Sequence, residues 1–447
     1  MSKVKVRFAP SPTGNLHVGN LRTAMVNYLF ARRADGHFML RIDDTDTERS
    51  TPEFEASIRA DLTWMGMEWD SEDRQSQRLD RYDEALQKLV ADGRAYACYE
   101  TQEELSLKRK SQLMAGKPPV YDRAALALSD VDKQKLEADG RRPHYRFKLN
   151  HEQVSWTDLI RGDVAYHMSS LSDPVLMRED GRVIYTLASV VDDIDHGITA
   201  ILRGEDHVTN SAAQIQLFEA LGATPPQMGH LALLAGADGE GLSKRLGSLS
   251  VRQLREEGIE APALASLLAR IGTSAPVVSQ ASLADIIAGF DITSFGRATP
   301  KFSPDELAQI NARVLQQMEF ASVAERLAEA NLAAVDERFW MAVRGNISTL
   351  LDAGDWWAVC HQPLTPEIED EELLAAALAE LPEGPFGPDS WSQWTKAVTA
   401  ATSKKGKALF MPLRKALTGR AFGPDVGILL CYMTREVVAK RLAGQTA

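Results

Sequence analysis

The chain has 447 residues and a mass of 49.2 kDa, more than one hydrophobic core normally organises, so we expect about two to four domains of ~100–200 residues each. Hydrophobic residues make up 44% of it and charged residues 25%, which excludes a disordered or fibrous protein. No stretch approaches the ~18 consecutive apolar residues of a membrane span, and Met1–Arg7 leads into a loop without a signal-peptide core. We therefore expect a cytoplasmic protein without a membrane partner.

The cysteines and the charge distribution exclude further classes. Cys98, Cys360 and Cys431 are far apart and odd in number, which supports neither a disulfide framework nor a structural zinc site. The net charge of −12 argues against indiscriminate binding to nucleic acid. The charge is uneven, however: 367–389 holds eight acidic residues and no Lys or Arg, whereas 396–447 holds ten basic residues against two acids. This basic segment is typical of either a polyanion-binding surface or a solvated helix face.

Apolar spacing predicts alternating strands and helices near the N-terminus. A strand, a turn-rich loop, a helix, a second strand and a second helix are expected at 3–9, 10–14, 17–32, 38–42 and 52–65. This order is typical of a parallel α/β sheet. Residues 95–180 are less regular, and we interpret them as an insertion. Further strands are expected at Val183–Leu187, Ile198–Arg203 and Leu231–Leu234, after which the chain becomes helical from about residue 250.

The string RFAPSPTGNLHVGNLRTA at residues 7–24 carries the first chemical signal. A strand leads through a Pro/Gly loop into a helix N-terminus, where free backbone N–H groups and the helix dipole favour an anion. His17 and Asn20 share the first turn and offer neutral donors to a phosphate whose charge rises in a transition state. Gly19 allows another backbone or a ligand to come close. An isolated H-x-G would instead suggest a capped helix with a surface histidine, but the full string favours the functional interpretation.

This string resembles the signature of class I aminoacyl-tRNA synthetases, in the form found in glutamyl-tRNA synthetases. A second string, Gly241-Leu242-Ser243-Lys244-Arg245, is similar to the K-M-S-K-S loop of that family, with Gly241 in place of the first lysine. The resemblance implies a Rossmann-like, parallel-sheet α/β catalytic domain with an inserted α/β subdomain, followed by all-helical stem-contact and anticodon-binding domains. The expected boundaries are 1–94 and 181–250 for the catalytic domain, 95–180 for the inserted acceptor-binding subdomain, 251–322 for the stem-contact domain and 323–447 for the anticodon-binding domain.

The resemblance also implies a reaction and its residues. A glutamate–tRNA ligase would use ATP, with Mg²⁺, to form glutamyl-adenylate and pyrophosphate, and would then transfer the glutamyl group to the terminal adenosine of tRNA(Glu). The catalytic residues it implies are His17, Asn20 and Lys244, and the ATP-binding residues are these three with Gly19, Asp206, Ser243 and Arg245. The glutamate-binding residues it implies are Arg7, Ala9, Ser11, Asp43, Tyr185, Ser189 and Arg203. The tRNA-binding residues are Arg344, Lys404, Lys405, Lys407 and Arg414.

The side-chain carboxylate of glutamate requires a fixed guanidinium, because the two parallel N–H donors of arginine bind both of its oxygens at once. The side-chain amide of glutamine has the same shape but no negative charge to pair with the arginine. Arg203 is the best candidate, although alone it would also suit a surface arginine paired with a neighbouring acid. Asp43 and Ser189 depart from the family, which commonly has glutamate and asparagine there. Many relatives bind zinc near Cys98, but one sulfur in that string cannot supply the four ligands of a structural zinc, so we expect no protein-bound metal.

Two other functions fit parts of the sequence. A tRNA-modifying paralogue that attaches glutamate to a modified base would resemble the catalytic half alone, and the basic, helical C-terminal third counts against it. A non-catalytic or regulatory RNA-binding paralogue is suggested by Gly241, Asp43 and Ser189. The retention of His17, Lys244 and Arg203 opposes it. The sequence leaves open whether tRNA(Gln) is charged as well as tRNA(Glu). A monomer is expected because it is the family norm.

Overall fold

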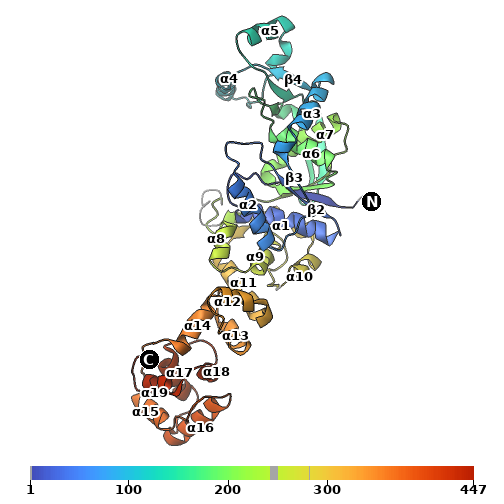
Figure 1. Cartoon of the computed structure of the whole chain (residues 1–447). Helices are drawn as coiled ribbons and strands as arrows, with labels where there is room; N and C mark the ends of the chain where they lie inside the picture. Colours follow the sequence, from blue (N-terminus) through green and yellow to red (C-terminus); the bar gives the residue numbers. More distant parts are fainter. Residues whose placement is uncertain (1–2, 242–249, 281) are drawn as a thin grey trace. The chain divides into compact units, whose positions relative to one another are not determined.

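The structure is a computed structural model of the chain, and it describes residues 3–241, 250–280 and 282–447 (Figure 1). It divides into two compact units. The first comprises Met1–Leu254, Ala265–Val278 and Ser282–Ser303, and the second Arg255–Leu264, Ser279–Ala281 and Pro304–Ala447. Among the described residues, no helix has both the length and the apolar character needed to cross a membrane.

Parallel strands form the centre of the first unit. They are β1 (Lys5–Phe8), β2 (His37–Ile42), β3 (Ser71–Arg74), β9 (Ala200–Gly204) and β10 (Gln227–Leu231). β1 pairs with β2, β2 with β3 and β9 with β10, all in parallel. The backbone N–H of Thr199 donates to the carbonyl of Lys5 at 2.8 Å, which places β9 beside β1. The spatial order is therefore β3-β2-β1-β9-β10, as predicted for a parallel α/β sheet.

Helices of the first unit connect and cover these strands (Figure 1). They are α1 (Val18–Arg33), α2 (Pro52–Trp64), α3 (Leu79–Ala91), α6 (Tyr185–Asp195), α7 (Val208–Ala220) and α10 (Leu283–Ala288), while α8 (Val251–Glu256) and α9 (Ala261–Leu268) contribute to both units. A short parallel pair joins β11 (Ala235–Gly236) to β12 (Lys301–Phe302). α2 begins where expected, because the Thr51 hydroxyl accepts from the Phe54 N–H and Pro52 opens the first turn.

Two details of the predicted elements were wrong. The strand expected at Val183–Leu187 is the entry to α6, which begins at Tyr185; its β-branched and aromatic residues fit a strand pattern, but they pack in a buried helix. The strand expected at Leu231–Leu234 ends at Leu231 instead. β1 is also buried on both faces, so Arg7 does not point to solvent between Val6 and Phe8.

The segment 95–180 forms the insertion. It contains an antiparallel sheet of β4 (Ala95–Cys98), β5 (His144–Phe147) and β8 (Val175–Met177), a hairpin of β6 (Gln153–Asp158) and β7 (Gly162–His167), and the helices α4 (Gln102–Met114) and α5 (Asp130–Ala138). Phe147, Val154 and Leu176 share a buried cluster with Leu187 and Met228, so the insertion and the parallel strands have a common hydrophobic core.

The second unit is helical beyond Pro304. Its helices are α11 (Pro304–Gln317), α12 (Ala324–Glu329), α13 (Glu337–Val343), α14 (Asp352–His361), α15 (Glu371–Ala379), α16 (Ser390–Thr402), α17 (Lys407–Thr418), α18 (Val426–Leu430) and α19 (Arg435–Leu442). Trp340 and Trp394 lie fully buried in its core. An α/β unit followed by a helical unit is the fold class that the sequence predicts.

Candidate active site

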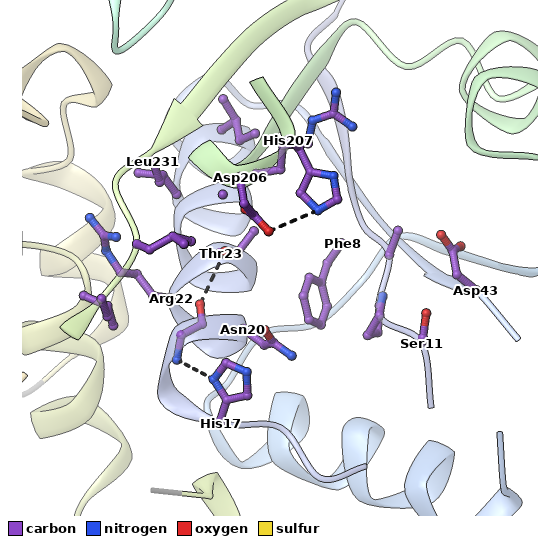
Figure 2. A pocket seen from close by; sticks show the side chains of 18 of the residues that line it. Phe8, Ser11, His17, Asn20, Arg22, Thr23, Asp43, Asp206, His207 and Leu231 are labelled. Carbon is purple, nitrogen blue, oxygen red and sulfur yellow. Dashed lines mark hydrogen bonds and ion pairs between the residues drawn. The ribbon is translucent and has the colours of Figure 1, made fainter. Parts of the chain in front are cut away.

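A cavity of about 690 Å³ opens at the carboxyl ends of β1, β9 and β10 (Figure 2). β1 continues through α1 to β2 on one side and has β9 on its other side, so this is the position where the strand order reverses. Ligands of open parallel sheets bind at such positions. The cavity brings together most of the site residues predicted from the sequence, namely Arg7, Ala9, Ser11, His17, Gly19, Asn20, Asp43, Tyr185, Arg203 and Asp206.

His17 is the N-cap of α1, and its imidazole has one defined tautomer. Nδ1 accepts a hydrogen bond at 3.1 Å from the backbone N–H of Gly19, so Nδ1 is unprotonated and the ring proton lies on Nε2. Burial lowers the pKa of His17, which keeps the ring neutral at physiological pH. His17 and the exposed Asn20 both face the cavity from the first turn of α1 (Figure 2). They therefore present neutral donors where the helix dipole favours an anion.

Glycine is required at position 19 because of this imidazole. A Cβ added to Gly19 would lie 2.9 Å from Cε1 and 3.0 Å from Nδ1 of His17. Gly19 also lines the cavity, and its predicted role in letting a ligand come close stays a prediction.

Arg203 is 5% exposed and sits at the end of β9. Its Nη1 donates to the Tyr185 hydroxyl at 2.8 Å, and its Nη2 donates to Ser211 Oγ and Gln214 Oε1, both at 2.6 Å. Nε is buried and finds no partner among the described residues. Arg203 lines the cavity, and a guanidinium fixed in this way is suited to a ligand carboxylate.

Arg7 reaches the same cavity through a buried ion network. Its Nε and Nη2 donate to the two carboxylate oxygens of Asp193 at 3.0 and 3.3 Å, and Arg41 donates to Asp193 Oδ1 at 2.7 Å. Arg41 also holds both oxygens of Asp43, at 2.7 and 3.2 Å. Burial raises the pKa of Asp43 to about 6, against the lowering effect of Arg41. Asp43, which has one methylene fewer than the glutamate common in the family, thus lines the cavity, and its hydrogen bonds from Arg41 fix the orientation of its carboxylate.

Three further residues at or beside the cavity are not among the predicted site residues. Arg22 donates to the carbonyls of Ala232 and Ile271 at 2.7 and 3.0 Å, and burial lowers its pKa to about 10, which leaves it charged at neutral pH. His207 packs its ring 5.6 Å from that of Tyr185. Asp193 joins the two buried arginines. The hydrogen-bond partners of Arg22 and Asp193 lie far away along the chain, so the sequence alone did not reveal them.

Other predicted residues lie elsewhere. Ser189 is fully buried and is not among the residues that line the cavity; its hydroxyl donates to the Tyr185 carbonyl at 2.6 Å and accepts from Gln214 at 2.9 Å. Ser243, Lys244 and Arg245 lie outside the described residues, and their roles stay predictions.

The residues that flank this undescribed segment lie at the cavity. Gly241 is one of its lining residues, and Ser250 forms an antiparallel bridge with His17.

The predicted tRNA-binding residues differ in their environment. Lys405 and Lys407 are exposed, whereas Lys404 pairs with Asp370. Arg414 donates to the Pro424 carbonyl at 2.7 Å, and Arg344 to the Met318 carbonyl at 2.7 Å. The acidic and basic segments recognised in the sequence therefore partly neutralise each other, and only part of the basic charge faces solvent.

Three possible metal ligands meet in the insertion. The ligand atoms of Cys98, Glu100 and His144 lie within 4.8 Å of one another, since β4 and β5 place Cys98 opposite His144. Tyr121 donates to Glu100 at 2.8 Å, and burial raises the pKa of the Cys98 thiol to about 11. His144 escaped the sequence analysis. With one sulfur, one imidazole and one carboxylate, the cluster falls short of the four-ligand set of a structural zinc, and the absence of zinc stays a prediction.

Comparison with known proteins identifies the family. The description "tRNA synthetases class I (E and Q), catalytic domain" matches residues 3–308, and "Anticodon binding domain" matches residues 358–445. The chain belongs to the class I tRNA synthetases of this E and Q family.

Individual relatives are similar over nearly the whole chain. The glutamate–tRNA ligase 1 of Maricaulis maris (strain MCS10) is 54% identical, with 99% of this chain and 100% of the relative covered. The glutamate–tRNA ligase of Azospirillum brasilense is also 54% identical, with the same coverage. The crystal structure of a glutamate tRNA ligase from Elizabethkingia meningosepticum in complex with its amino acid has a TM-score of 0.85 at 28% identity, with 99% of each chain covered.

Proposed function

We propose that this chain is a glutamate–tRNA ligase. It activates L-glutamate with ATP to glutamyl-adenylate, releasing pyrophosphate, and transfers the glutamyl group to the 3′-terminal adenosine of tRNA(Glu). The observation that carries the proposal at the site is Arg203, a 5% exposed guanidinium that lines the cavity and is held there by Tyr185, Ser211 and Gln214. Full-length relatives named glutamate–tRNA ligase support the same reaction.

The reaction needs no protein nucleophile, so the residues act by position and charge. The α-carboxylate of glutamate attacks the α-phosphorus of ATP, and pyrophosphate leaves. Arg203 and Arg7 hold the side-chain carboxylate, while Asp43 attracts the amino group. His17 Nε2–H and Asn20 donate to phosphate oxygens whose charge rises in the transition state.

The undescribed loop and Mg²⁺ complete the proposed ATP site. The family resemblance gives Lys244 the role of neutralising the leaving pyrophosphate. Of the residues that flank 242–249, Gly241 lines the cavity and Ser250 pairs with His17. When bound with ATP, Mg²⁺ would offset phosphate charge; this metal takes most of its ligands from phosphates and water and therefore needs few protein carboxylates. The exposed Asp206, at the cavity wall, is one available carboxylate.

The proposed partner is tRNA(Glu), which binds in part through the second unit. We propose no association with a membrane. A monomer working in the cytoplasm is part of the same proposal. The tRNA-modifying alternative gains no support, since the match to an anticodon-binding domain covers 358–445.

ATP-dependent attachment of labelled glutamate to purified tRNA(Glu) and, separately, to tRNA(Gln) tests the function. We expect charging of tRNA(Glu), and the tRNA(Gln) reaction decides whether the enzyme discriminates. Arg203→Lys keeps the charge but loses the fork, so we expect KM for glutamate to rise at least about thirtyfold with KM for ATP unchanged. No charging of either tRNA by folded protein would overturn the proposal.

A further inference from the structure

The inner side of Arg203 is held by α7. Ser211 and Gln214 are three residues apart on this helix and so lie on one face, where both accept from Arg203 Nη2 at 2.6 Å. Gln214 in turn donates to Ser189 at 2.9 Å. Within the described part of the chain, Tyr185 is the one hydrogen-bond partner of the guanidinium from another element, and it accepts from Nη1. The direction of the fork therefore depends on how firmly the two α7 acceptors are themselves oriented.

Ser211 is oriented by His230 of β10. The His230 ring is fully buried, and its Nε2 lies 2.7 Å from Ser211 Oγ. Its Nδ1 lies 2.5 Å from Asp158 Oδ2. A serine hydroxyl has a single proton, so its other contact, 3.3 Å from the His207 carbonyl, competes with the one to His230. The shorter distance favours the histidine.

Asp158 fixes the tautomer of His230. It ends β6, and its Oδ1 accepts from the backbone N–H groups of His230, Ile160 and Arg161 at 3.0–3.1 Å. Burial opposes ionisation, but the hydrogen bonds from His230 and these amides bring the pKa of Asp158 down to about 2, so it is a carboxylate and must accept from Nδ1–H. Nε2 of the neutral ring is then an acceptor, and the Ser211 hydroxyl donates a hydrogen bond to it. The Ser211 lone pairs are left to face Arg203.

The three hydrogen bonds that link Arg203 to Ser211, Ser211 to His230 and His230 to Asp158 all donate in the same direction, towards Asp158. A role in packing alone does not account for it. Asp158 is already satisfied on Oδ1 by three backbone donors, and an apolar side chain at 230 would fill the core without a buried polar ring. This hydrogen-bonded series ends at Arg203, which lines the cavity, and each side chain in it fixes the orientation of the next.

We propose that His230 is a positioning residue for amino-acid selection: with Asp158 and Ser211, it sets the direction of the Arg203 fork and thereby the affinity for the glutamate side-chain carboxylate. The inference rests on the proposed function, in which Arg203 binds that carboxylate. His230 touches no substrate and acts only through Arg203.

Two substitutions at 230 separate positioning from packing. His230→Asn can place its amide nitrogen where Nδ1 lies and so keeps the bond to Asp158, but it is too short to reach Ser211. His230→Gln can place its amide oxygen where Nε2 lies and keeps the bond to Ser211. With tRNA(Glu) present, we expect H230N to raise KM for glutamate at least tenfold while KM for ATP stays within twofold, and H230Q to recover most of the loss. Discrimination against glutamine should fall in H230N by a similar factor.

Further variants keep the test decisive. Ser211→Ala removes the same link without changing the buried ring and should reproduce the H230N phenotype, which covers the case in which H230N fails to fold. Equal KM values for glutamate in wild-type, H230N and S211A protein would overturn the inference, as would a parallel change in both KM values. The Arg203→Lys variant separates this from the proposed function: if it too leaves KM for glutamate unchanged, the assignment of Arg203 fails, and if it alone raises KM, only the role of His230 fails.

Discussion

One carboxylate oxygen, Asp193 Oδ1, accepts from both Arg7 Nε at 3.0 Å and Arg41 Nη1 at 2.7 Å. The three side chains are almost completely buried. Burial alone would raise the pKa of Asp193, but the two guanidinium groups hold it below its usual value. Asp193 is therefore the acid paired with Arg7, which faces the cavity, and it shares Arg41 with Asp43 and Asp192.

Replacing Asp193 with asparagine is expected to destabilise the first unit by ~3–5 kcal/mol, because it removes the carboxylate paired with the buried guanidinium of Arg7 and one of the three acids around Arg41. Asp195→Asn is the matched control. Asp195 lies on the same helix and pairs with Arg78 and Arg81, but it is 24% exposed, so its loss should cost at most ~1 kcal/mol. Urea unfolding followed by circular dichroism measures both. Equal midpoints for the two variants would contradict the role of Asp193.

Gly19→Ala is expected to slow adenylate formation about tenfold to a hundredfold without unfolding the protein. The new methyl group must displace the His17 ring, and loss of one donor to a transition-state oxyanion costs ~10²–10³ in rate. Alanine itself favours the helix. Gly387→Ala is the control, since its Cβ would meet nothing within 4 Å. Pyrophosphate exchange in the presence of tRNA(Glu) is the measurement, and a wild-type rate in G19A would show that the ring position does not matter.

The sequence could predict the elements and residues whose signals are local. The helix that begins after His17, the proline start of α2 and the clustering of Arg7, Tyr185 and Arg203 at one cavity all follow from short strings or from the family resemblance. The partners of the buried arginines could not be predicted in this way. Asp193 and His230 act on residues far away in the chain, and a buried acid in a helix has the same local pattern as a capping one.

The same limit explains the errors. Val183–Leu187 has the composition of a strand. It leads into a buried helix instead, because tertiary packing outweighs the local propensity. The ten basic residues of 396–447 looked equivalent, yet their charge is divided by contacts with the acidic segment, such as Lys415 with Glu367 and Glu369.

This division predicts unequal contributions to tRNA binding. Lys405→Ala and Lys407→Ala should each weaken binding of tRNA(Glu) and reduce the slope of log K against log salt by about 1, because an exposed lysine can release counterions from a phosphate. Lys404→Ala should have less than half of that effect, since Lys404 is already paired with Asp370. Filter binding at several salt concentrations gives both quantities. Identical slopes for all three variants would show that the pairing with Asp370 does not persist.

Purified protein is expected to contain no stoichiometric zinc. Cys98 is the only sulfur of the Cys98, Glu100 and His144 cluster, and burial raises the pKa of its thiol to about 11, which disfavours the thiolate that zinc requires. Elemental analysis after dialysis measures the content, with Cys98→Ser as the control. About one zinc per chain in the wild type and none in C98S would contradict the prediction and would identify this cluster as the site.

The pH dependence of stability should report the protonation of His230. Burial lowers its pKa below 6.5, Asp158 opposes this change, and the charges of Arg203 and Arg161 lower it further. Between that lowered pKa and 6.5 the unfolded state binds more protons than the folded state, so the stability that His230 contributes is complete above pH 6.5 and declines as the pH falls, by at most ~1.4 kcal/mol per pH unit. The His230→Gln variant lacks a titratable group at position 230 and keeps all the other histidines of the wild type. We therefore expect the stability difference between wild type and H230Q, measured by urea unfolding from pH 7.5 to 5.5, to move against the wild type below pH 6.5. A difference that moves in favour of the wild type on acidification would mean that His230 is protonated in the folded protein, so that its Nε2 donates to Ser211 and the His230–Ser211 link runs the other way. A difference that stays constant would mean that folding leaves the pKa of His230 unchanged, which contradicts the prediction.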